Sequence, residues 1–151
     1  MHFFEGAWPL LVSVGPMQTT DVELEQTWAG YERYFARGER YALMTVSPRE
    51  AQSPGARERK RMADWANTPR VREFSKKLCV GSATVVPSAI MQGALTAILW
   101  LWKPAAPHLA VRTVADGLTF CLERLAAEKV PIPQGPEALR RAVNAEVAQI
   151  V

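Results

Sequence analysis

Apolar residues recur along the chain in short β-rich runs, separated by longer segments with helical periodicity. The runs cover 8–14 (WPLLVSV), 40–46 (RYALMTV), 79–86 (CVGSATVV) and 109–114 (LAVRTV). Such runs, bounded by turn-forming or polar residues, are typical of strands. The stretch HFF before the turn pair Glu5-Gly6 predicts one further short strand, which folds back on 8–14 as a hairpin.

The first long segment between strands has the pattern of an amphipathic helix. Thr20 and Glu23 form a capping-box pair, which favours a helix start, and Gly38 is the expected stop. Between them, one apolar stripe recurs at i, i+4, i+7 and i+11: Leu24, Trp28, Tyr31 and Phe35.

The second segment is expected to form two helices. A helical pattern begins at Ala56 but cannot pass Pro69 unchanged, because proline removes a backbone donor and crowds the preceding turn. We therefore place a break at 67–68, with Thr68 as the cap of the second helix and Pro69 at its first position. Further helices are expected over 88–102, from a Thr113 cap through 129, and over the last 15 residues or so.

Strands alternating with helices predict an α/β fold: a mixed, mostly parallel sheet of four to five strands with helices packed on it. At 151 residues the chain is expected to form one such domain over 1–129. A proline-rich linker follows at 130–136 (VPIPQGP), and then an amphipathic C-terminal helix at 137–151.

The helix expected at 88–102 is apolar almost all the way round. Its apolar stretch is roughly 14 residues long, short of the ~20 that a membrane span needs, so no transmembrane segment is predicted. A helix that covers one sheet face needs only an apolar stripe. We expect the surplus to be buried within the monomer, by the C-terminal helix, or by a second subunit, an apolar ligand or a membrane surface; the residues that carry it are Ile98, Trp100, Leu101 and Trp102.

The C-terminal helix has a narrow apolar stripe at i, i+4, i+8 and i+11, formed by Leu139, Val143, Val147 and Ile150. Its linker allows three arrangements: docking on its own domain, exchange onto a neighbouring copy, or contact with something else. Both apolar stripes are candidate interaction surfaces.

The charge of the chain adds little to these candidate interaction surfaces. The net charge is only +3, which is too mild to indicate nucleic-acid binding unless the basic residues cluster. The densest basic stretch supplies a candidate anion-binding face, although interleaved acidic residues favour a solvated helix surface; its members are Arg57, Arg59, Lys60 and Arg61.

The sequence carries no readable catalytic or metal motif. The two histidines, His2 and His108, have no readable partner, and Cys79 and Cys121 lie in apolar segments, which indicates buried structural thiols in a cytoplasmic protein. The Cys and His spacing does not suit zinc, and no phosphate-binding or dinucleotide glycine pattern is present. We therefore predict no enzyme activity, no metal and no cofactor, while a cleft with polar groups around His108 would favour an enzyme.

Four segments together resemble the STAS/SpoIIAA-like family of small α/β domains: PLLVSVGPMQTTDVELEQ, RYALMTVS, LCVGSATVVPSAIMQGALTAILWLWKP and VRTVADGLTFCLERL. The resemblance spans most of 3–128 and implies a regulatory or protein-interaction domain, sometimes a carrier of an apolar ligand. Many anti-sigma antagonists of this type carry a phosphorylatable Asp-Ser pair at a helix start. This chain has no such pair there, so Ser47 and Ser53 are candidates by position only.

These features lead to three hypotheses of function. The first is a non-catalytic regulatory or interaction module that forms a homodimer through Trp100, Trp102 and their neighbours, partly covered by the C-terminal stripe. The second is a domain that binds an apolar ligand or lipid between helix 88–102 and the sheet. The third is an enzyme whose site the sequence does not reveal.

Overall fold

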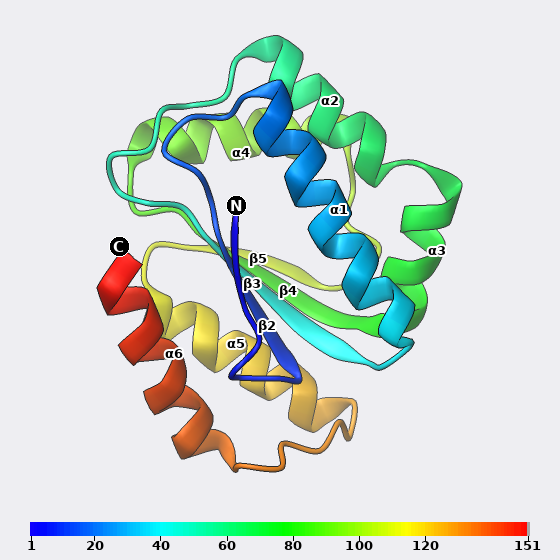
Figure 1. Ribbon diagram of the computed structural model, residues 1–151, viewed down its shortest axis with the longest axis vertical. Coiled ribbons are helices and arrows are strands. Elements are labelled where there is room, and N and C mark those ends of the chain that lie inside the picture. Colours follow the sequence, from blue (N-terminus) through cyan, green and yellow to red (C-terminus); the bar gives the residue numbers. More distant parts are fainter. Residues whose placement is uncertain (151) are drawn as a thin grey trace.

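The computed structural model describes residues 1–150, with side chains through residue 149, as five strands and six helices (Figure 1). The strands are β1 (His2–Phe4), β2 (Leu10–Val14), β3 (Tyr41–Val46), β4 (Cys79–Val85) and β5 (His108–Val111). The helices are α1 (Asp21–Arg37), α2 (Ala56–Ala66), α3 (Pro69–Leu78), α4 (Ala89–Leu101), α5 (Val114–Ala127) and α6 (Pro136–Ile150). None of these helices is both long and apolar enough to span a bilayer.

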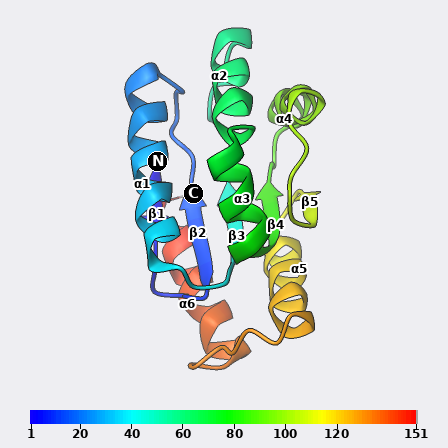
Figure 2. The same cartoon turned by 90° about the vertical axis from the view of Figure 1, so that its right-hand side faces the viewer.

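The predicted α/β fold is confirmed. The five strands form one sheet in the order β1-β2-β3-β4-β5, in which β1 is antiparallel to β2 and all other neighbours are parallel. Each crossover advances by one strand in the same direction, and right-handed crossovers that do so place their helices on one face of the sheet. Accordingly α1, the α2–α3 pair and α4 lie side by side on that face (Figure 2).

Side-chain caps define where several helices begin. Thr20 accepts a hydrogen bond from the Glu23 amide at 3.2 Å, and Thr113 accepts one from the Asp116 amide at 3.1 Å, as the sequence predicted. The break before Pro69 is also confirmed, with Pro69 in the first turn of α3. The last strand ends at Val111 rather than 114, because Thr113 already caps α5.

The opposite face of the sheet is covered by α5 and α6 (Figure 1). Helix α5 lies along β3, β4 and β5, and α6 lies against β2 and α5. Leu139, Val143 and Val147 are buried in the same apolar core as the strands, and the linker residues Val130 and Ile132 pack against that core. Of the three arrangements open to the C-terminal helix, the structure shows docking on its own sheet.

This docking corrects two expectations. The described part of the C-terminal stripe is not a free interaction surface, because residues of the chain's own core bury it. It also does not cover α4, since α4 and α6 lie on opposite sides of the sheet (Figure 1). The side chain of Ile150 lies outside what the structure describes.

The two faces of the sheet are packed differently. On the α5 side, Gly117 allows a close approach: a β carbon there would lie 2.9 Å from the Met44 sulfur and 3.1 Å from Val85. On the other side α1, α2 and α4 stand farther from the strands, and α3 is the helix whose backbone comes nearest, beside β4. This difference leaves room between the sheet and the first helical layer.

Replacing Leu139 by alanine should lower the free energy of unfolding by about 2–5 kcal/mol, because it leaves a cavity beneath α6 in a fully buried position. Urea unfolding monitored by tryptophan fluorescence measures this loss. Arg141→Ala on the exposed side of the same helix is the matched control and should change little. Equal stability of the Leu139→Ala variant and the wild type would contradict the docking of α6.

Candidate functional site

A cavity of about 260 Å³ lies between the sheet and the helices α1, α2 and α4. Aromatic rings form much of its wall: Trp28, Tyr31 and Phe35 from α1, Trp65 from α2, and Trp102 after α4. The Trp65 ring is central to this wall, with centroids 5.9 Å from Trp28, 5.7 Å from Tyr31 and 6.3 Å from Phe35. The helical stripe that the sequence predicted on α1 therefore borders a cavity.

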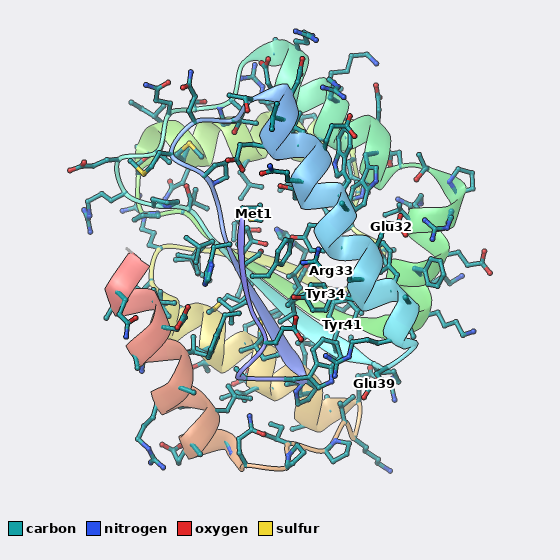
Figure 3. All side chains as sticks on the ribbon, in the orientation of Figure 1. Met1, Glu32, Arg33, Tyr34, Glu39 and Tyr41 are labelled. Carbon is teal, nitrogen blue, oxygen red and sulfur yellow. The ribbon has the colours of Figure 1, made fainter. Side chains whose placement is uncertain are left out.

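A second aromatic group closes the end of the sheet away from Met1. Trp8 stacks on Tyr34 and Tyr41, with centroid distances of 6.0 and 5.8 Å, and the Arg37 guanidinium lies 3.8 Å from the Trp8 ring. Figure 3 shows Tyr34 and Tyr41 at that end and Met1 at the free end of β1. The cavity thus extends along α1 between these two ends.

The floor of the cavity combines apolar strand residues such as Leu43 with several hydroxyl side chains. Strand residues alternate between faces, so the parallel register aligns Ser13, Thr45 and Thr84 across β2, β3 and β4 on the cavity side. The Ser13 and Thr45 hydroxyl oxygens lie 3.0 Å apart, and the Tyr31 hydroxyl lies 3.3 Å from that of Ser13. A row of hydroxyl groups therefore faces the aromatic wall.

The neighbouring row on the floor holds a serine–histidine pair. Ser82 on β4 is in register with His108 on β5, and the Ser82 hydroxyl lies 2.8 Å from Nδ1 of His108. The other ring nitrogen, Nε2, is buried and has no hydrogen-bond partner among the described residues. Burial lowers the pKa of His108, so its imidazole is neutral near pH 7.

Charge is nearly absent from the lining. Within the described residues, the charged groups that line the cavity are the Met1 ammonium and the Glu23 carboxylate, which pair with each other at 2.6 Å. Lysine and arginine are missing from the described lining. The interior therefore offers neutral hydrogen-bonding groups to whatever occupies it.

The Ser82–His108 pair lacks other parts of a hydrolytic site. The Ser82 amide already donates to the Pro107 carbonyl at 2.9 Å, so it is not a free oxyanion donor. Since Nε2 of His108 contacts no carboxylate in the described structure, no third group orients the ring. Burial raises the pKa of Cys79 to about 11 and that of Cys121 to about 12, which keeps both thiols protonated and weakly nucleophilic.

The apolar residues of α4 do not form one surface. Trp100 is 83% exposed and Leu101 is 53% exposed, whereas Ile98 is buried and borders the cavity. Trp102 follows the end of α4 in an extended conformation and turns inward, with its ring edge-on to His108 at 6.5 Å. The two tryptophans therefore differ in environment: Trp100 is exposed on α4, whereas Trp102 lines the cavity.

The basic residues of α2 are engaged in contacts. Arg57 and Arg61 both pair with Asp21 of α1, and Lys60 pairs with Asp64 at 2.6 Å. The Arg61 hydrogen bond is the main reason why the pKa of Asp21 lies below its usual value. Arg59 donates to the Pro54 carbonyl at 2.7 Å. These contacts join α2 to α1, to its own helix start and along its own surface, and anion binding by this face stays a prediction.

A second hollow, of about 350 Å³, lies at the surface between the β2 start and the linker. Its lining includes Glu39, Arg40 and Lys129 together with linker prolines. Arg40 already pairs with Glu128 at 3.0 Å. Among the residues that the structure describes, no buried polar atom without a partner lines this hollow.

Sequence reasoning missed the polar floor. The run 79–86 predicts a strand but does not single out Ser82 and Thr84, which are two residues apart and share a face. Thr45 and Ser13 show the same signal, a hydroxyl inside an apolar strand run. Register between strands decides whether such residues meet, and register is not readable from one sequence.

Comparisons of the chain with protein-family models, with curated proteins and with solved structures gave no match.

The lowered pKa of His108 predicts how stability responds to acid. The unfolded chain binds a proton at an ordinary histidine pKa of about 6.5, whereas the folded state resists protonation. The contribution of His108 is therefore complete above that pH and is lost as the pH falls from it through the lower folded-state pKa. Urea unfolding between pH 7.5 and pH 5 should show a shallower loss for His108→Gln than for the wild type, with His2→Gln as control; identical slopes for all three proteins would contradict the prediction.

Proposed function

We propose that this protein is a non-catalytic binding domain that holds an apolar small molecule between its sheet and the helices α1, α2 and α4. The observation that carries the proposal is the 260 Å³ cavity, with aromatic walls and a neutral polar floor. Ligand sites are commonly apolar, with a few placed polar groups, and hold about 300–1,000 Å³. This cavity lies just below that range.

Packing energetics support an occupant. Protein interiors are packed densely and contain few voids larger than a water molecule. The close packing of α5 on the other face of the same sheet indicates that such a space is not required by the fold.

The STAS/SpoIIAA-like resemblance is part of this proposal. The mixed five-stranded sheet is the architecture that the resemblance implies, and carriage of an apolar ligand is among the roles it implies. A regulatory role is compatible with ligand binding, because a ligand that binds only one state of the domain shifts its population.

A neutral fluorescent probe, N-phenyl-1-naphthylamine, tests the cavity directly. Wild-type protein should bind it with a micromolar Kd and a large rise in emission, since the probe moves from water to an apolar site. Thr84→Phe and Leu95→Trp, from the floor and from α4, should each reduce the emission by filling the cavity. Thr119→Phe adds the same ring at an exposed position of α5 and is the matched control.

Native mass spectrometry of gently extracted protein supplies the second readout and should show a co-purified small molecule. An unchanged apo mass, together with equal probe emission from the wild type and both cavity-filled variants, would overturn the proposal.

Self-association through the outer face of α4 is a second candidate function. It is supported by the exposure of Ile90 (75%), Trp100 (83%) and Leu101 on a helix without charged residues. Exposed apolar patches are typical of interaction surfaces.

Sedimentation velocity should show a dimer for the wild type and a monomer for Trp100→Ser, because the substitution removes the largest exposed apolar side chain of the patch. Val22→Ser, at an exposed apolar position on α1, is the control and should remain dimeric. A wild-type monomer at tens of micromolar would exclude this role.

A further inference from the structure

We infer that the ligand is an uncharged aromatic molecule that carries a hydroxyl or carbonyl group, and that Ser82 and His108 receive this group. The inference rests on the proposed binding function and specifies its chemistry. Three properties of the described lining lead to it: the stacked aromatic wall, the absence of an unpaired cation, and a lining histidine whose Nε2 has no hydrogen-bond partner.

The wall favours a flat ring. Trp28 and Phe35 each stack on Trp65, with interplanar angles of 14° and 13°, so the wall is a cluster of rings that hold one another in place. A further ring that adds to such a cluster gains stacked or edge contacts beyond the burial of its area. A flexible alkyl chain would gain only the burial and would lose rotamer entropy on binding.

The lining disfavours an ionised ligand. A buried carboxylate or phosphate needs a partner charge, because desolvation of an unpaired ion is costly. The described lining contains no lysine or arginine, the Met1 ammonium is taken by Glu23, and His108 is neutral. Fatty acids and phospholipid head groups therefore find no counter-ion inside the cavity.

The floor supplies a place for one neutral polar group. His108 Nδ1 is held by the Ser82 hydroxyl at 2.8 Å, while Nε2 is buried without a partner among the described residues. A neutral imidazole offers either an N–H or a lone pair at Nε2, according to which nitrogen carries the proton. Ser82 can accept or donate at Nδ1, so the pair adapts to a ligand hydroxyl or to a ligand carbonyl. Burying a polar atom of this kind without a partner is unfavourable, and a hydrogen bond from the ligand's group would relieve this.

Three probes of one ring size separate these contributions: naphthalene, 2-naphthol and 2-naphthoate. Titration calorimetry near neutral pH should show that the wild type binds 2-naphthol roughly 2- to 10-fold more tightly than naphthalene, the gain of one buried hydrogen bond. The ionised 2-naphthoate should bind more weakly than naphthalene. In His108→Leu the advantage of 2-naphthol should disappear while naphthalene binding persists, and His108→Gln should restore part of the advantage.

The naphthalene titration of each variant reports whether its cavity is intact, which separates loss of recognition from loss of fold. Ser82→Ala is a second variant and should also reduce the 2-naphthol advantage, because it frees the His108 ring. If no probe binds to the wild type, the binding function itself fails. If the probes bind but 2-naphthoate binds best, or His108→Leu keeps the full preference for 2-naphthol, the binding function stands and this inference is overturned.

Discussion

The arrangement of the whole molecule depends on the handedness of its β-α-β crossovers. Four parallel strands follow one another in sequence order, and each right-handed crossover adds its helix to the same face. The other face would remain bare without the segment that follows β5. Helices α5 and α6 cover it, so the proline-rich linker and the C-terminal helix complete the apolar core (Figure 1).

The two faces of the sheet are consequently packed by different kinds of residue. The α5–α6 face is aliphatic and closely packed, with Gly117 and Gly81 allowing helix α5 to approach the strands. The crossover face carries large aromatic rings from α1 and α2, which line the space between these helices and the strands. Ion pairs from Arg57 and Arg61 to Asp21 join α2 to α1 along the outside of this layer. The cavity lies beneath it, over the row of hydroxyl groups and the Ser82–His108 pair.

Much of the fold was predictable from local patterns. Periodicity placed the helices and strands, Thr20 and Thr113 marked two helix starts, and Pro69 marked the break between α2 and α3. The candidate site was harder to predict from the sequence. Trp100 and Trp102 were grouped because both are apolar and close in sequence, yet the helix ends between them and their side chains separate. The sequence did not predict that basic residues of α2 pair with Asp21, because Asp21 lies more than 30 residues earlier in the chain.

What the sequence determined by itself was the order and type of the elements, because hydrophobic period, caps and prolines act over a few residues. The α/β class followed from that order. Only the tertiary structure decided that α6 docks on β2 and that Trp102 turns inward. It also decided that Ser13, Thr45 and Thr84 share a row beside Ser82 and His108. These features depend on strand register and layer spacing, which arise from contacts between residues far apart in the chain.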